Sequence, residues 1–537
     1  MSRFNWDSGA LFQSENLPPD LLDRAKHARF LTITINNEVN PDRGNDIDSI
    51  KSHVLNLNAD WGAGKTYFLK RWANSLKQDH PVVYIDTWST DYLESPLITV
   101  LTELLEQLKE QTSEKVSQTA IDKANIVLKK AAPKVASAVM KKFLGFDLSI
   151  FTSDSENQTA DPKSNDDTKS NDSKKNEINF AAAGEAILNE FYNEHKSHKQ
   201  NVEALSKSIK DWVKLVKENP VNKICTTTID YPAYIFIDEL DRCKPTYAVE
   251  MLEAIKHVFD ISGLVFVVAT NTKELQHTIK AVYGAGFNAE SYLNRFFDSK
   301  YFIRTSLSVE MLLTHCETTF LESDYLVDKN VVLFPFVDET KEKLLSFAVS
   351  LFNAFEIAPR EAIKIINRLK FSVLSLANVK VDISVLLVMI TLLSHSKEKY
   401  DTFLFEMLNY RYANISHVTR LSEVQTAISK VRINMNNEEQ EREIAEESLK
   451  LGKDISSYLK STNSFSFSHY LAAISERVNG PFGTLINTLI SNKGKIRGSS
   501  EPDYGLMVRI LKCFNDVEMN IEKYKDVVEL ANNLDMA

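Results

Sequence analysis

Cysteine, glycine and long apolar runs are all scarce in this chain. Its 537 residues include only 15 glycines and 4 cysteines, and the cysteines are scattered without the spacing of a metal site or a disulfide framework. They predict reduced, mostly buried thiols in a cytoplasmic protein, and we expect Cys243 to be structural. The formal net charge of -10 argues against a protein dominated by nonspecific nucleic-acid binding, although a local basic patch stays compatible with it.

No apolar stretch has the length and composition of a membrane-spanning helix. Residues 131–151 are interrupted by lysines, and the apolar parts between the charges are too short to cross ~30 Å of hydrocarbon. A basic amphipathic helix on a membrane surface is the alternative that this stretch leaves open. The run Ile383–Leu393 is shorter still and typical of a core helix, and residues 1–23 lack a signal-peptide pattern. We therefore expect a cytoplasmic protein without a membrane span.

The few glycines are informative where two of them lie close together, at Gly62 and Gly64. They follow a short apolar strand that includes Leu55. Backbone N–H groups can wrap around a phosphate at such a turn, because glycine has no side chain that would collide with it. Lys65 supplies a positive charge, and Thr66 offers a hydroxyl to Mg²⁺ and opens a helix whose N-terminal dipole favours anions. The segment therefore predicts a phosphate-binding loop for ATP and Mg²⁺.

This loop departs from the usual pattern at its first glycine, which is Ala59 here. Alanine is tolerated at that position if its φ angle stays negative. Thr66 is the expected magnesium ligand of the loop, and Lys65 is also a catalytic candidate. The residues predicted to bind the nucleotide are Asp60, Trp61, Gly62, Ala63, Gly64, Lys65, Thr66 and Tyr67.

A second apolar strand, at residues 234–237, ends in the acidic segment Asp238–Asp241. Taken alone, this pattern also fits a buried strand followed by a solvated acidic turn. Together with the loop upstream it predicts a Walker B strand, in which Asp238 holds Mg²⁺ and Glu239 orients and deprotonates the attacking water. The two segments then form the two halves of one nucleotide site.

A third apolar strand, Leu264–Ala269, is followed by three polar residues. P-loop ATPases place a residue that senses the γ-phosphate at the tip of the strand beside Walker B. Asn271 is the first candidate for this role and Thr270 the second. A turn-forming asparagine after a strand explains the same residues equally well.

These motifs together resemble the KAP family of P-loop NTPases, which belongs to the additional-strand, AAA-like group with the STAND ATPases. The most diagnostic part is Asp238–Cys243, supported by the helix segment Leu252–Lys256. Val82–Trp88 is similar to the family's strand ending in tryptophan, and Ser291–Asp298 to its Tyr-Leu-x-Lys/Arg segment. The resemblance covers about residues 20–370.

The resemblance also suggests roles for three arginines outside the two Walker segments. Ala358–Leu369 is similar to a Pro-Arg helix that follows the core in these ATPases, and Arg360 would then be a sensor that reaches the γ-phosphate from the lid. A proline at the first position of an ordinary helix explains Pro359 equally well. Arg295 and Arg304 are weaker candidates for an arginine finger from a neighbouring subunit, and a surface or salt-bridging arginine is the alternative for each.

Alternating strands and helices predict an α/β fold, a three-layer α/β/α sandwich with a parallel sheet, followed by an α-helical C-terminal region. A helix at residues 20–31 either packs beside the adenine or caps the sheet. The insertion between the Walker strands contains a tract rich in Ser, Asn, Asp and Lys that we expect to be disordered. The predicted parts are a lead-in at 1–49, a core at 50–307 with the insertion at about 113–230 and its disordered tract at 152–177, a lid-like domain at 308–400 and a helical domain at 401–537.

Two functions compete. One is a working Mg²⁺-dependent ATPase that serves as a component of a multi-protein system. The other is a slowly hydrolysing, nucleotide-gated oligomeric scaffold or switch that recruits a separate effector. The intact set of Lys65, Thr66, Asp238 and Glu239 favours the ATPase. The resemblance implies a homo-oligomer and partners encoded nearby, and bacterial members of the family often look like parts of anti-phage defence systems.

Overall fold

The computed structural model describes most of the chain outside the predicted insertion and part of the C-terminal region. The described residues are 4–42, 44–92, 96–112, 203, 205–221, 229–336, 340–408, 423–434, 464–467, 470–471 and 521–533. The tract at 152–177, expected to be disordered, and the stretch at 131–151 lie outside these residues, as do Cys225 and Cys513. Within the described ranges, no helix is both long and apolar enough to cross a membrane.

The chain divides into two compact units. One comprises Met1–Ala59 and Gly64–Ile303, and the other comprises Asp60–Ala63 and Arg304–Ala537. Each is described by itself below. The finer division into lead-in, core, lid-like and C-terminal domains stays a prediction.

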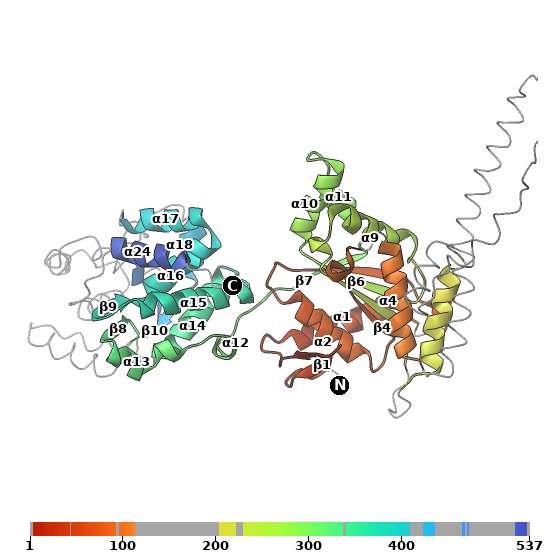
Figure 1. Cartoon of the computed structure of the whole chain (residues 1–537), viewed down its shortest axis with the longest axis horizontal. Coiled ribbons are helices and arrows are strands. Elements are labelled where there is room, and N and C mark those ends of the chain that lie inside the picture. Colours follow the sequence, from red (N-terminus) through yellow and green to blue (C-terminus); the bar gives the residue numbers. More distant parts are fainter. Residues whose placement is uncertain are drawn as a thin grey trace, which may run out of the picture. The chain divides into compact units, whose positions relative to one another are not determined.

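A five-stranded parallel sheet forms the centre of the first unit (Figure 1). Its strand order is β4-β5-β6-β3-β7, so β6 lies between the strand that precedes the predicted loop and the predicted Walker B strand. β6 is therefore an intervening strand that separates β3 from β5. The strands are β3 (His53–Asn58), β4 (Val82–Asp86), β5 (Ala233–Asp238), β6 (Leu264–Thr270) and β7 (Ser299–Phe302).

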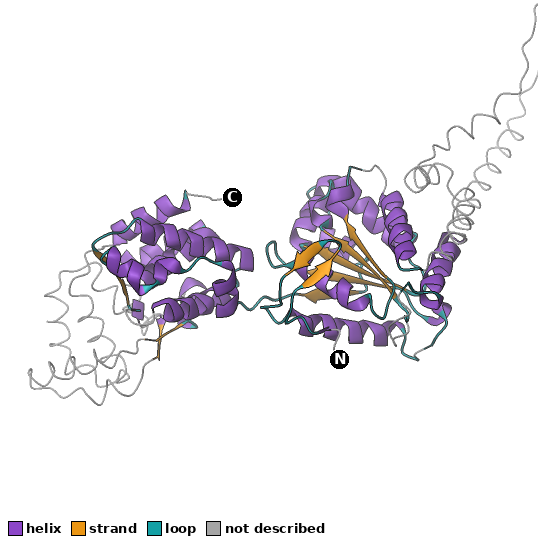
Figure 2. Ribbon diagram, turned by 60° about the horizontal axis from the view of Figure 1, so that its bottom comes forward, coloured by secondary structure: helices purple, strands orange, loops and turns teal. Residues whose placement is uncertain are grey.

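Helices cover both faces of this sheet (Figure 2). α1 and α2 lie on one side of it, while α9 and α10 lie on the other (Figure 1). The predicted three-layer α/β/α sandwich is therefore confirmed. Among the described helices of the unit are α1 (Arg24–Val39), α2 (Lys65–Leu76), α3 (Thr87–Thr90), α4 (Pro96–Glu110), α9 (Pro245–His257), α10 (Thr272–Tyr283) and α11 (Ala289–Leu293).

The core of the sandwich is aromatic and fully buried. Every residue of β5 and β6 is buried, as expected for near-continuous apolar strands covered on both faces. Trp72 of α2 packs edge-on against Phe236 and tilted against Tyr234, with ring centroids 5.2 and 6.2 Å apart. Its indole Nε1 donates to Thr32 Oγ1 at 2.8 Å, which joins α2 to α1. This packing holds the first helix after the loop firmly on the sheet.

The N-terminal segment differs in part from the expectation. The predicted helix over residues 20–31 begins at Arg24 and continues to Val39, and it packs on α2 as a helix that caps the sheet does. A short hairpin that the sequence analysis missed precedes it, formed by β1 (Ala10–Phe12) and β2 (Glu15–Leu17). Three residues per strand are too few to give a readable alternation.

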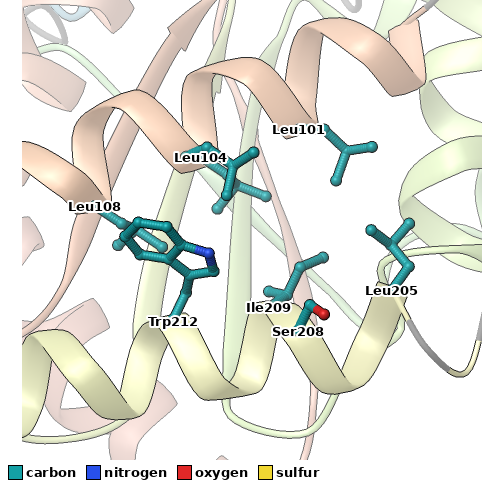
Figure 3. A pocket seen from close by; sticks show the side chains of 8 residues that line it. Leu101, Leu104, Leu108, Leu205, Ser208, Ile209 and Trp212 are labelled. Carbon is teal, nitrogen blue, oxygen red and sulfur yellow. The ribbon is translucent and has the colours of Figure 1, made fainter. Parts of the chain in front are cut away.

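Part of the predicted insertion is described and packs against α4. Residues 205–218 are helical, and their apolar side chains face those of α4 across a narrow seam (Figure 3). The seam therefore closes the α4 edge of the unit by apolar packing. It is lined by Leu101, Leu104, Leu105, Leu108, Leu205, Ser208, Ile209 and Trp212.

The described residues of the second unit are mainly helical, as predicted, and they include two short strand pairs that were not expected from the sequence. In this unit, the predicted core helix is confirmed, because every residue from Ile383 to Leu392 of α16 is buried. Its helices are α12 (Val309–His315), α13 (Ser323–Asp328), α14 (Thr340–Ala354), α15 (Pro359–Leu374), α16 (Ile383–His395), α17 (Lys397–Leu408), α18 (Glu423–Ser429) and α24 (Ile521–Asn532), and its strand pairs are β8 (Val331–Phe334) with β9 (Val379–Asp382) and β10 (Arg432–Asn434) with β11 (Ser464–Ser466).

Asp382 begins the buried helix α16 and gathers several donors. Its Oδ1 accepts from the backbone N–H groups of Ser384 and Val385, both at 3.0 Å, and its Oδ2 accepts from the Tyr470 hydroxyl. Burial raises the pKa of this carboxyl to about 6, although these hydrogen bonds lower it. The carboxyl group therefore joins the start of α16 to Tyr470 within the buried part of the second unit.

We expect Asp382→Ala to destabilise the second unit by about 2–4 kcal/mol, because it removes an N-cap and leaves buried donors without an acceptor. Asp382→Asn keeps one carbonyl oxygen and should lose less. Hydrogen exchange of the α16 amides, compared with that of Asp401→Ala on the exposed face of α17, measures the effect. Unchanged protection of α16 in Asp382→Ala would show that the carboxyl group does not anchor this helix.

Candidate nucleotide-binding site

The predicted loop connects the end of β3 to the start of α2. Gly62 and Gly64 adopt φ angles of +77° and +83°, in the left-handed region that glycine tolerates best. The N–H of Ala63 donates to the carbonyl oxygen of Asp60 at 3.2 Å, which closes a tight turn. Ala59 does not adopt a positive φ, so the alanine at the first position of the pattern is unstrained. The backbone thus has the conformation for which the glycines were singled out.

Positive charge collects where this loop enters α2. Lys65 is the first residue of the helix, and its Nζ donates to the carbonyl oxygen of Ala59 at 2.7 Å, so the ammonium group lies back over the loop. The first turn of α2 contains no acidic residue. The N-terminal dipole of the helix therefore adds to the Lys65 charge, and the two together suit an anion such as a phosphate.

Glu239 meets the loop even though β6 separates β3 from β5. Glu239 Oε1 lies 3.5 Å from Thr66 Oγ1. The residue follows the end of β5 and adopts a φ of +57°, an uncommon conformation for a residue with a side chain. This conformation turns the Glu239 side chain back toward Thr66, so the structure brings the two predicted halves of the site together.

Asp238, the last residue of β5, is almost completely buried, with 1% of its surface exposed. The Tyr84 hydroxyl donates to its Oδ2 at 2.8 Å, and the N–H of Glu239 donates to its Oδ1 at 2.9 Å. Burial raises the pKa of this carboxyl, and hydrogen bonds from Thr66, Tyr84 and the Glu239 N–H oppose that rise. The site therefore contains a desolvated carboxyl beside the Thr66 hydroxyl.

The Asp238 carboxyl and the Thr66 hydroxyl are oxygen groups of the kind that a hard divalent cation binds. Mg²⁺ in nucleotide sites takes one or two protein oxygens and completes its shell with water and phosphate oxygens. Among the residues that the structure describes, no three or more His, Cys, Asp or Glu side chains gather into a metal-binding group. The oxygens of Asp238 and Thr66 are the protein groups here that could hold such a cation together with phosphate oxygens.

Glu239 is less buried than Asp238 and carries its own ion pair. Its Oε2 lies 2.9 Å from a guanidinium nitrogen of Arg242, and 16% of the Glu239 side chain is exposed. Partial burial raises the pKa of the Glu239 carboxyl, and the Arg242 charge opposes this. A carboxylate with a raised pKa is a better proton acceptor near neutral pH than an ordinary one.

The polar residues after β6 have structural partners. Asn271 caps α10, because its Oδ1 accepts from the N–H of Lys273 at 3.2 Å. Thr270 Oγ1 accepts from Asn56 Nδ2 at 2.8 Å. The side-chain oxygen of Asn271 thus has the local role of a residue that ends a strand and begins a helix. A contact of Asn271 with the γ-phosphate stays a prediction.

The sequence analysis missed a buried polar group that joins β3 to the end of β6. Asn56 Oδ1 accepts from Thr272 Oγ1 at 3.1 Å, and Asn58 Oδ1 accepts from the N–H of Thr272 at 3.0 Å. The available signal was the pair of asparagines in an otherwise apolar strand. The contact of Tyr84 with Asp238 was not predicted either, because a tyrosine in an apolar strand is common and does not by itself indicate a site.

The remaining predicted loop residues lie in varied surroundings. The Tyr67 hydroxyl donates to the carbonyl oxygen of Pro18 at 3.0 Å, so Tyr67 binds the N-terminal segment, and burial raises its pKa to about 12. Trp61 is half exposed, with 51% of its surface accessible. A contact of either residue with the nucleotide stays a prediction.

The three arginines suggested for the γ-phosphate lie in different elements of the chain. Arg360 lies in the first turn of α15 in the second unit, after Pro359 at the start of that helix. Arg295 and Arg304 are exposed, as surface arginines are. Their proposed actions on the γ-phosphate stay predictions.

The intervening strand, the glycine turn, Lys65 and the acidic pair after β5 define the class of this protein. It is a P-loop NTPase, with nucleotide-binding elements at the carboxyl ends of a parallel sheet. The model of the KAP family P-loop domain matches residues 45–375, which is more than half of the chain, so the protein belongs to the KAP family. A search of curated proteins finds no match to it.

Proposed function

We propose that this protein is a Mg²⁺-dependent ATPase. The observation that carries the proposal is the meeting of Glu239 with Thr66, 3.5 Å apart, beside the buried carboxyl of Asp238. Phosphoryl transfer depends mainly on positioning and charge neutralisation, and these three residues with Lys65 supply groups for both. Membership of the KAP family supports nucleotide binding and hydrolysis as the activity of the domain.

In the bound state, the backbone N–H groups of the glycine turn and the Lys65 ammonium hold the β- and γ-phosphates. Thr66 and Asp238 would hold Mg²⁺, which would supply positive charge to the phosphate oxygens. To bind in this way, Lys65 exchanges the carbonyl oxygen of Ala59 for phosphate oxygens. The ammonium group is already beside the loop, so a rotation of its own side chain is sufficient.

In the hydrolytic step, Glu239 orients a water molecule in line with the bond between the γ-phosphorus and the β-γ bridging oxygen. The water oxygen attacks the γ-phosphorus, its proton passes to the Glu239 carboxylate, and that bond breaks to leave ADP and phosphate. Asn271 is proposed to contact the γ-phosphate or the water, and Arg360 to act as the sensor on the γ-phosphate. Arg295 or Arg304 would act only from a neighbouring subunit.

The proposed biological setting is that of the ATPase component of a multi-protein system, with the chain as a homo-oligomer. Bacterial anti-phage defence is the form of this setting that the resemblance to the KAP family favours. Steady-state hydrolysis of ATP and of GTP, with and without Mg²⁺ and with the products of neighbouring genes, tests the proposal. Mass determination with and without nucleotide, run in parallel, separates a working ATPase from a slow nucleotide-gated scaffold.

Tyr84→Phe should weaken the binding of Mg²⁺ with nucleotide by about tenfold, because outer partners that orient a metal-binding carboxylate contribute at this level. The readout is the Mg²⁺ concentration at which a fluorescent ATP analogue is half bound. Tyr234→Phe is the matched control, since it removes a buried hydroxyl of β5 that donates to Asn36 instead. Equal Mg²⁺ dependence in both variants would remove Tyr84 from the site.

A further inference from the structure

The two carboxylate oxygens of Glu239 face different partners. Oε1 lies on the side of Thr66 and the loop, at 3.5 Å from the threonine hydroxyl. Oε2 is held by Arg242, which follows three residues later, at 2.9 Å. One oxygen therefore faces the predicted phosphate site while the other is anchored away from it.

Arg242 is itself supported on its other side by an aromatic ring. Its guanidinium carbon lies 5.4 Å from the centroid of the Trp88 ring, within the range of a cation–π contact. Trp88 is 54% exposed, so burial in the core does not account for its placement. Arg242 is only about one-third exposed in its side chain, although it carries a full charge.

The backbone fixes both supporting residues close to the end of β5. Trp88 lies in α3, whose start is capped by Asp86, since the carboxylate of Asp86 accepts from the N–H of Trp88 at 3.1 Å. Asp86 is the register partner of Asp238 in the parallel pair β4–β5. Arg242 lies in a single turn, and its backbone N–H donates to the carbonyl oxygen of Glu239 at 3.1 Å. Trp88 and Arg242 thus follow the ends of two neighbouring strands, and Trp88 contacts Arg242 while Arg242 contacts the Glu239 carboxylate.

We propose that Arg242, supported by the ring of Trp88, is a positioning residue for Glu239 in ATP hydrolysis. It holds Oε2, and this presents Oε1 to the attacking water. This inference rests on the proposed ATPase function. Catalytic bases commonly need a third group that orients them, because a freely rotating carboxylate spends little time in line with the water. Arg242 and Trp88 supply that orientation without touching the nucleotide.

The test compares turnover with nucleotide affinity in four variants of the full-length chain. Arg242→Gln should lower kcat by about 10- to 100-fold, in the range found for lost orienting partners, and leave the Kd for a fluorescent ATP analogue within about threefold. Arg242→Lys should recover part of kcat, because an ammonium can still pair with Oε2. Trp88→Ala should lower kcat less than Arg242→Gln does, and Trp88→Phe should retain it, since phenylalanine keeps a ring face for the cation.

Arg29→Gln, an exposed arginine of α1, is the matched control and should behave as wild type. A double-mutant comparison supplies a second readout. If Arg242 acts through Glu239, adding Arg242→Gln to the Glu239→Gln variant should cause no further fall in kcat. A purely structural role would lower stability and turnover in both backgrounds. Thermal melting of each variant separates these cases, and Arg242→Lys and Trp88→Phe keep the test valid if Arg242→Gln does not fold.

The inference is overturned if folded Arg242→Gln hydrolyses ATP at the wild-type rate. It is also overturned if Arg242→Gln loses nucleotide affinity in parallel with kcat, since Arg242 would then contact the nucleotide. These outcomes differ from a failure of the proposed function, in which the wild-type protein itself hydrolyses no ATP or Glu239→Gln has no effect.

Discussion

Glu239→Gln is expected to lower kcat for ATP hydrolysis by about 10²- to 10⁴-fold while ATP still binds. Glutamine has the size of glutamate but cannot accept a proton from the attacking water, and general-base catalysis contributes on this scale. The Arg242 ion pair is also lost, because the glutamine side chain is neutral. The loop, Lys65 and Asp238 are untouched, so the affinity for ATP should change little and bound ATP should persist.

Single-turnover hydrolysis of radiolabelled ATP, together with equilibrium binding, measures both halves of this expectation. Glu250→Gln, an exposed glutamate of α9, makes the same chemical change on the same unit and should hydrolyse ATP normally. If Glu239→Gln turns over at the wild-type rate, Glu239 is not the residue that activates the water. The proposed mechanism would then need another base.

Lys65→Ala is expected to weaken ATP binding by at least about 100-fold and to remove hydrolysis. The substitution deletes the point charge that lies over the loop and leaves only backbone N–H groups and the α2 dipole for the phosphates. A hydrogen bond to a charged group contributes about 1.5–3 kcal/mol, and in the proposed bound state one ammonium would contact more than one phosphate oxygen.

Calorimetric titration with ATP and Mg²⁺ measures the change directly. Lys51→Ala removes an exposed lysine just before β3 and serves as the control for loss of positive charge. Unchanged ATP affinity in Lys65→Ala would contradict the assignment of the phosphate loop itself. Because Glu239→Gln spares binding and Lys65→Ala removes it, the pair separates the two halves of the site.

The local features of the site could be predicted from the sequence. Gly62 and Gly64 require a conformation that few other residues tolerate, and the structure finds both at positive φ. Asp238 follows a continuous apolar run, and such a run predicts a buried strand wherever it occurs. Both signals depend on residues close together in the chain, so no knowledge of strand pairing was needed to find them.

The partners of these residues could not be predicted, because they come from distant parts of the chain. Tyr84 reaches Asp238 only because β4 pairs in parallel with β5. Thr270, the second sensor candidate, accepts from Asn56 only because β6 pairs in parallel with β3. Strand order and register set these contacts, and neither has a local sequence signal.

The sequence by itself thus determined that this is an α/β P-loop protein, and it singled out Lys65, Thr66, Asp238 and Glu239 as the residues now proposed for its site. These signals could be identified in the sequence because each is a property of a short segment. They are the conformation that glycine allows, the apolar runs and the types of the charged side chains. Only the tertiary structure decided that β6 lies between β3 and β5, that Glu239 turns toward Thr66 at a φ of +57°, and that Arg242 holds its other oxygen. The strand order and the meeting of Glu239 with Thr66 depend on long-range packing, because they join segments far apart in the chain. The Arg242 contact spans only three residues, but it depends on the backbone conformation that the turn after β5 adopts in the folded chain.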